Sequence, residues 1–186
     1  CGDVVGGDRR PDQQRRGQYN SIAIDSQGRP HIAYYDETLA DLRYAVKNGA
    51  WSIEVADGTW GQYAEMTLDG SDRPHIVYFD PIATEMLYTV KIGSLWIDEV
   101  VSTESADYLG IALDPAGNPV LHSRSGGYLN VYRRIDGAFT NIGAYSTTAE
   151  VDGAMAIDNN GNIHIFYQDI AGGAADLWYL EVKDSV

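Results

Sequence analysis

The sequence predicts an all-β fold made of four copies of a four-stranded unit, and three observations support this. The chain has 186 residues, of which 44% are apolar and 22% are charged. That is enough for one globular domain with a buried core. It contains 20 Gly and 13 Tyr, a composition typical of short strands joined by tight turns. The third observation is a repeat of about 44 residues.

The repeat is clearest in an aspartate that ends the first strand of each copy. These aspartates are spaced 44, 45 and 44 residues apart: Asp25, Asp69, Asp114 and Asp158. In three copies a glycine follows at a fixed distance: Gly28, Gly117 and Gly161. Because Asp accepts hydrogen bonds from turn amides and Gly adopts positive φ, each segment predicts a hairpin turn. The second copy has Gly70 instead, which predicts a different type of turn.

A second strand follows each turn. In the first, second and fourth copies this strand opens with a histidine: His31, His75 and His164. In the third copy Val120 takes this place. The strand is apolar on both faces, as expected for a strand that lies between neighbouring sheets. A third strand is expected around a tyrosine in every copy: Tyr44, Tyr88, Tyr132 and Tyr179. An aromatic residue then opens a fourth strand: Trp51, Trp96 and Phe139.

Four-stranded units of this length, packed radially, predict a four-bladed β-propeller of antiparallel blades. The expected blades cover residues 18–60, 61–105, 106–150 and 151–186. The pattern Asp-x-x-Gly-x-Pro-His-Ile-x-Tyr, followed by Leu-x-Tyr and Trp, resembles the blades of bacterial propellers related to NHL and BNR/sialidase-like repeats. The resemblance covers residues 18–186 and implies the propeller fold. It implies little about activity, because such blades serve lectins, scaffolds and hydrolases alike.

The fourth copy stops at Val186, before its outer strand. We expect residues 3–5 to supply that strand and to close the ring, since an unpaired edge would expose backbone donors and acceptors. Two alternatives stay open. Residues 1–17 form a disordered tail, or two chains join into an eight-bladed ring.

The N-terminal segment, residues 1–17, is treated as an anchor or linker. It begins with Cys1, the only cysteine, and resembles the start of a mature bacterial lipoprotein. That resemblance implies lipid attachment at Cys1 and an exported, membrane-anchored protein on the periplasmic or outer surface. The alternative is a fragment that happens to begin at Cys1. Four Arg and three Asp give this segment a net charge of +1, against −15 for the rest, which suits an anionic membrane surface.

The overall charge and the single cysteine exclude several classes of partner. The net charge of −14 argues against a nucleic acid, because phosphate binding needs a positive field. One cysteine also excludes an internal disulfide and any cysteine-based zinc site. We expect no cofactor.

Candidate site residues fall into two groups. The repeated histidines and turn aspartates are expected to serve the fold. A ligand or partner face is expected around the central channel, formed by Tyr19, Tyr63, Tyr108, Asp36, Asp80, Asp169 and Arg124. Tyrosine rings and carboxylates suit sugars, and the same oxygens would suit Ca²⁺ in the channel. Alternatively, the aspartates cap turns and the tyrosines pack between blades.

No catalytic motif stands out. The Ser-x-Asp-x-Gly-x-x-Trp box of sialidases is absent, as are a serine nucleophile elbow, a phosphate loop and His-Glu-x-x-His. We therefore expect a non-enzymatic binding or scaffold propeller, docked onto a protein partner within a membrane complex. The alternative is a carbohydrate-binding lectin with Tyr/Asp sites. The third copy lacks the repeated histidine and aspartate and has His122 and Arg124 instead, which favours one asymmetric partner surface.

Overall fold

The computed structural model describes residues 17–147, 153–169 and 176–183, and these residues form fifteen β-strands and no helix. They make four antiparallel sheets, which confirms the predicted all-β class. The first sheet contains β1 (Gly17–Ile24), β2 (Pro30–Asp36), β3 (Asp41–Asn48) and β4 (Ala50–Asp57). The second contains β5 (Gln62–Leu68), β6 (Pro74–Asp80), β7 (Glu85–Ile92) and β8 (Leu95–Ser102). The third contains β9 (Asp107–Leu113), β10 (Pro119–Ser125), β11 (Tyr128–Ile135) and β12 (Ala138–Ser146). The fourth contains β13 (Gly153–Ile157), β14 (Ile163–Asp169) and β15 (Asp176–Val182).

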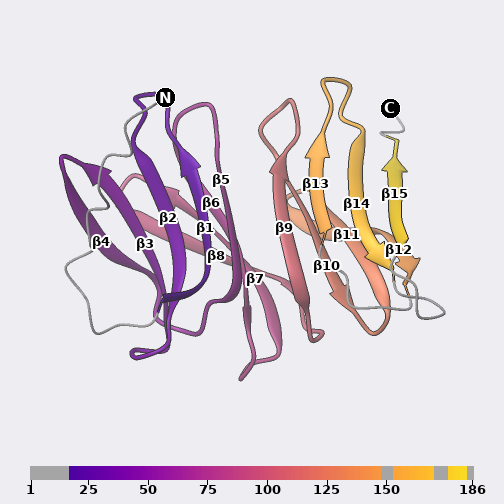
Figure 1. The fold of residues 1–186 in the computed structure, drawn as a ribbon, viewed down its shortest axis with the longest axis horizontal. Helices are drawn as coiled ribbons and strands as arrows, with labels where there is room; N and C mark the ends of the chain where they lie inside the picture. The colour runs from indigo at the N-terminus through magenta and orange to yellow at the C-terminus, as the bar shows by residue number, and fades with distance from the viewer. Residues whose placement is uncertain (1–16, 148–152, 170–175, 184–186) are drawn as a thin grey trace.

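Within each sheet the strands lie in chain order, as in a propeller blade. The inner strands pack on one another in the same order, β1 against β5, β5 against β9 and β9 against β13 (Figure 1). No helix long and apolar enough to cross a membrane occurs in the part of the chain that the structure describes.

The four sheets do not form the closed ring that we expected. In Figure 1 the first sheet lies at one side of the molecule and β15 at the other, with the remaining sheets between them. A ring of four sheets needs a quarter turn between neighbours, and here the sheets follow one another without returning to the first. Residues 3–5, the expected closing strand, lie outside the described residues.

The hydrophobic core is divided into three layers, each between two consecutive sheets. We call the face of a sheet that packs on the following sheet its forward face, and the opposite face its rear face. In the layer between the first and second sheets, the forward face of the first sheet contributes Ala33 and Tyr44. The rear face of the second sheet contributes Met66 and Tyr78. Similar layers join the second sheet to the third and the third to the fourth. Each sheet is therefore stabilised mainly by its neighbours.

The repeated aspartates lie in the turns where the sequence places them. Asp25 Oδ1 accepts hydrogen bonds from the backbone N–H groups of Gln27 and Arg29 at 2.9 and 2.7 Å, and the other three aspartates accept equivalent bonds. The expected change of turn in the second copy does not occur. Asp72 adopts φ of +61° there, as Gly28 does at +78°, and its N–H makes the same bond to the first turn residue.

The third sheet differs from the repeat in its third strand. Phe166 lies opposite Tyr179, and Ala33 opposite Tyr44, but His122 lies opposite Val131. The expected alignment of Tyr132 with the repeated tyrosines is therefore wrong by one residue, because the β10–β11 hairpin is shorter. Tyr132 packs instead in the layer toward the second sheet.

Candidate functional site

Three tyrosines form a row across the inner strands. Tyr19 in β1, Tyr63 in β5 and Tyr108 in β9 adopt positive φ angles of 48°, 55° and 49°. This left-handed conformation is uncommon for residues other than glycine and costs of the order of 1 kcal/mol. Each tyrosine lies where the pairing between the first and second strands shifts register. Such bulges re-aim side chains and are frequent next to functional sites.

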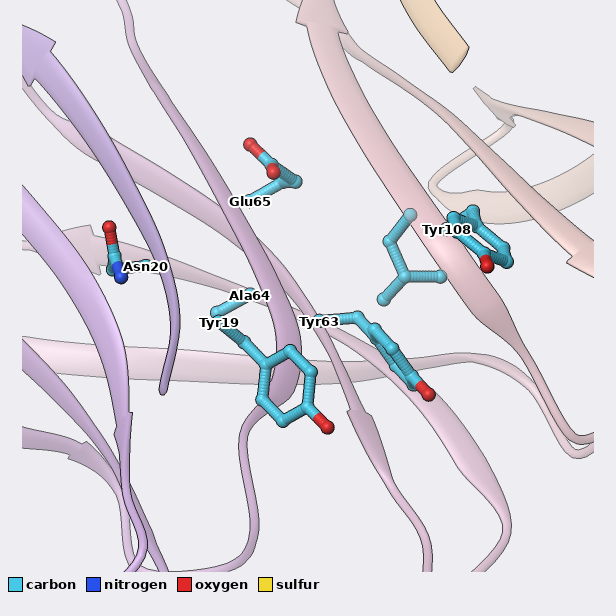
Figure 2. Close-up of a pocket in the computed structure, with 7 residues that line it drawn as sticks. Tyr19, Asn20, Tyr63, Ala64, Glu65 and Tyr108 are labelled. Carbon is cyan, nitrogen blue, oxygen red and sulfur yellow. The ribbon is translucent and has the colours of Figure 1, made fainter. Parts of the chain in front are cut away.

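A pocket lies between these rings. It has a volume of about 160 Å³. It is lined by Tyr19, Asn20, Tyr63, Ala64, Glu65, Tyr108 and Leu109 (Figure 2). The ring centroids of Tyr19 and Tyr63 are 4.8 Å apart and the rings are tilted by 53°. Burial raises the pKa of Tyr63, so its hydroxyl keeps its proton at neutral pH and can donate a hydrogen bond. The carboxylate of Glu65 accepts a hydrogen bond from Ser21 Oγ at 2.8 Å.

Arg124 extends this row with a polar cluster. Its guanidinium donates two hydrogen bonds to the Asp107 carboxylate, at 2.8 and 2.5 Å, and its Cζ stands 5.0 Å from the Tyr108 ring centroid. Both side chains line a second pocket of about 310 Å³, with Ser105, Ser125, Gly126 and Gly127. Arg124 lines the second pocket and stands beside the Tyr108 ring, which lines the first, so the two pockets are near each other. We call Tyr19, Tyr63, Tyr108, Asp107 and Arg124 the tyrosine–arginine face.

The predicted aspartates do not join this face. Asp36 is buried, and its Oδ1 accepts hydrogen bonds from the N–H groups of Thr38 and Leu39 at 3.0 and 3.3 Å. Asp80 does the same in the next sheet. The expectation that these carboxylates face a ligand is corrected, because an aspartate at a strand end caps the following turn. The side chain of Asp169 lies outside the described residues.

The repeated histidines connect each turn to the third strand. His31 Nε2 lies 3.1 Å from Asp25 Oδ2, and the Tyr44 hydroxyl is hydrogen-bonded to Nδ1 at 2.5 Å. His75 and His164 make the same tyrosine bond at 2.5 and 2.6 Å, with aspartates at 3.5 and 3.6 Å. In the third sheet Val120 takes the place of the histidine and Val131 takes the place of the tyrosine, so this pair is absent there. The structure thus places these histidines in structural networks away from the tyrosine–arginine face.

A Ca²⁺ ion in the central channel was considered from the sequence, and the described residues form no cluster of side chains that could bind it. Across residues 17–147, 153–169 and 176–183, no three His, Cys, Asp or Glu side chains gather where a metal could be held.

Sequence comparison gives no relative. No family model matches this chain, and no curated protein matches it.

Solved structures show that the four sheets are arranged like consecutive blades of a β-propeller. AofleA from Arthrobotrys oligospora superposes with a TM-score of 0.62 and 10% identity, covering 90% of this chain and 57% of that one. The six-bladed Aleuria aurantia lectin, described with a fucose recognition mode, superposes with a TM-score of 0.56 and 11% identity. That match covers 89% of this chain and 64% of the lectin. The NanB sialidase of Streptococcus pneumoniae superposes with a TM-score of 0.64 and 9% identity, covering 98% of this chain and 52% of the sialidase. The chain therefore spans between half and two thirds of these proteins.

Enzymes are among the proteins with this fold, and this overturns our expectation of a non-enzymatic protein. Besides the sialidase, an ulvan lyase gives a TM-score of 0.60 at 15% identity, covering 91% of this chain and 56% of that one. A Bacteroides thetaiotaomicron endo-arabinase gives 0.55 at 12%, covering 92% and 77%. The expectation rested on missing short motifs. A propeller can gather catalytic side chains from separate strands, so no contiguous motif is required.

Proposed function

We propose that the tyrosine–arginine face binds a carbohydrate. The observation that carries this proposal is the row of three tyrosines held in left-handed backbone conformations on consecutive inner strands. Each is a local cost in stability, and such strain is typically kept where a side chain must point in a required direction. Here the rings of Tyr19 and Tyr63 pack on each other, and Tyr108 lines the same pocket.

The chemistry of the face suits a sugar. The C–H face of a pyranose ring stacks on tyrosine, and its hydroxyl groups need hydrogen-bond partners beside the ring. Asn20 and Glu65 offer such groups in the first pocket, and Asp107 and Arg124 offer them in the second. At about 160 Å³, the first pocket suits one sugar residue, since drug-sized ligands occupy about 300–1,000 Å³.

The similar structures support the same class of ligand. They include a lectin described with a fucose recognition mode, a sialidase, and an ulvan lyase bound to a glucuronic acid–rhamnose sulfate chain. The net charge of −14 repels polyanions, so for this chain we favour a neutral sugar.

Calorimetric titration with a panel of neutral and acidic oligosaccharides tests the proposal, with chromatography of the same mixtures to detect cleavage. We expect binding of a neutral sugar, weakened at least about tenfold by Tyr63→Ala, which corresponds to about 1.4 kcal/mol. The matched control is Tyr145→Ala, because Tyr145 lies in β12 and lines neither pocket. Absence of binding across the panel, or equal loss in both variants, would contradict the proposal.

Predictions that depend on residues 1–17 stay predictions. These are the lipid at Cys1, the periplasmic or outer-surface location and docking onto a membrane complex. The intact mass of the protein isolated from its source membranes tests them, since attached acyl chains raise the mass above the 20.4 kDa of the polypeptide. An unmodified mass would remove the anchor.

A further inference from the structure

The third sheet departs from the repeat beside the row of tyrosines. Arg124 in β10 lies opposite Asp107 in β9 in the strand ladder. At the same place of the repeat, ten residues after the turn aspartate, the first two sheets have Tyr35 and Phe79. Those two aromatic residues are buried, whereas the side chains of Arg124 and Asp107 are 25% and 27% exposed. A partly exposed ion pair therefore stands where the other sheets have a buried ring.

The hairpin that follows β10 is also shorter than its equivalents. Residues 37–40 join β2 to β3, and residues 81–84 join β6 to β7, whereas Gly126 and Gly127 alone join β10 to β11. Both glycines adopt positive φ, at 58° and 83°, as a tight two-residue hairpin requires. Both line the second pocket and bring no side chain into it. The pocket of about 310 Å³ thus lies where the third copy differs most from the other copies.

The second pocket stands beside the tyrosine pocket. Arg124 Cζ lies 5.0 Å from the centroid of the Tyr108 ring, and Tyr108 lines the first pocket. Both members of the ion pair also act on Tyr63. Burial is the main cause of the raised pKa of Tyr63, and the charge of Asp107 adds to this effect while that of Arg124 opposes it. A ligand seated on the tyrosines can therefore extend toward the ion pair.

The second pocket offers hydrogen-bonding groups without an excess of positive charge. Nε and Nη2 of Arg124 donate to the two carboxylate oxygens of Asp107, at 2.8 and 2.5 Å. Ser125 Oγ, which lines the pocket, donates to Glu104 Oε2 at 3.3 Å. One guanidinium thus stands among two carboxylates, so an anionic group of a ligand is repelled. A neutral hydroxyl group is suited to this setting, because it can donate to a carboxylate and accept from a guanidinium.

We propose that the second pocket holds the next residue of the sugar chain, and that Asp107 selects a neutral sugar there over a uronic acid. This inference rests on the proposed carbohydrate site and adds to it a ligand of at least two sugar residues. Hydroxyl groups of the second residue donate to Asp107 and accept from Arg124. Without the Asp107 carboxylate, the planar guanidinium is left to bind the carboxylate of an acidic sugar through the same pair of donors.

Calorimetric titration with matched sugars tests this inference. The probes are neutral hexose disaccharides, such as lactose and cellobiose, their constituent monosaccharides, and the same disaccharides with one C6 oxidised to a carboxylate. We expect the unaltered protein to bind a neutral disaccharide at least about tenfold more tightly than the monosaccharide, because the second residue adds hydrogen bonds to charged groups. We expect the same disaccharide to bind at least about tenfold more tightly than its acid.

Two variants of the ion pair separate charge from shape. Asp107→Asn removes the negative charge and keeps an oxygen that accepts from Arg124. It should shift the ratio of acid to neutral affinity at least about tenfold toward the acid, and added salt should reduce this gain. Arg124→Gln introduces the residue that the fourth copy has at position 168. It should remove the advantage of the disaccharide over the monosaccharide without any gain for the acid.

Asp136→Asn is the matched control for the loss of one negative charge. Asp136 is exposed between β11 and β12, lines neither pocket and adopts φ of +52°, which asparagine tolerates. Circular dichroism checks that each variant folds. Equal affinity for monosaccharide and disaccharide, or the same acid-to-neutral ratio in Asp107→Asn and Asp136→Asn, overturns the inference and leaves the tyrosine site in place. Absence of binding by every sugar overturns the proposed function as well.

Discussion

The imidazole of His122 lies directly against the backbone of Gly110 on the neighbouring strand. The two residues are paired in the β9–β10 ladder, and a Cβ atom on residue 110 would stand 2.1 Å from His122 Nε2. The ring is fully buried, and neither nitrogen has a hydrogen-bond partner among the described residues. Ala33 and Val77 fill the same position in the first two sheets, so a titratable ring here occupies an aliphatic site.

Gly110→Ala is expected to destabilise the protein by about 1–3 kcal/mol, the usual cost of overpacking a filled core. The ring has little room to move away because the side chain of His122 is buried. Urea unfolding measures the change. Gly58→Ala is the control, since nothing lies within 4 Å of its added Cβ, and its stability should be unchanged or slightly higher. Equal stability of the two variants would contradict the close packing.

The protein is expected to lose stability between about pH 6.5 and pH 4 because of His122. Burial lowers the pKa of His122 to about 4 in the folded state, whereas the unfolded value is about 6.5. The unfolded chain therefore binds the proton first as the pH falls, and stability decreases with it. The difference in the free energy of unfolding corresponds to about 3.5 kcal/mol at most, at about 1.4 kcal/mol per pH unit.

His122→Val, which introduces the residue found at position 77, should remove this part of the pH dependence. Urea unfolding of both proteins across the same pH range measures the difference, and subtraction cancels the titration of the carboxylates. If the two proteins lose stability in parallel, His122 does not titrate as its burial requires.

The sequence predicted the strands and the turns well because both follow from local chemistry. The aspartate at each turn satisfies the amides of its own hairpin, and short apolar runs between the turns mark the strands. The closed ring could not be predicted in this way. The angle between neighbouring sheets depends on how the side chains of two sheets fill each layer, such as Tyr44 against Tyr78, and no local pattern encodes that angle.

The candidate site was predicted in part. The tyrosine row appeared in the repeat, because Tyr19, Tyr63 and Tyr108 occupy one position. For Asp36 the sequence left two readings open, because capping of the next turn and exposure to a ligand look alike in sequence, and the structure supports capping. Asp107 was missed. Its only signal is a place opposite Arg124 across the β9–β10 hairpin, which becomes visible once the register is known.

Tyr88→Phe is expected to destabilise the protein by about 1–2 kcal/mol, because it leaves Nδ1 of the buried His75 without its hydrogen bond. Tyr179→Phe removes the equivalent bond to His164 in an exposed setting, where water replaces the lost partner. It should cost less than about 0.5 kcal/mol. Thermal unfolding of dilute protein compares the two. Equal losses would mean that burial does not determine the strength of the repeated pair.

Replacement of Tyr19 should separate the stability of the fold from binding. Tyr19 adopts φ of +48°, which glycine tolerates without strain and alanine does not. We expect Tyr19→Gly to be more stable than Tyr19→Ala by about 1 kcal/mol, although both lack the ring that packs beside Tyr63. Urea unfolding measures the first effect and sugar titration the second. A more stable glycine variant that no longer binds sugar is the result expected if the strain at Tyr19 is retained for recognition. Undiminished binding by both variants would remove Tyr19 from the site.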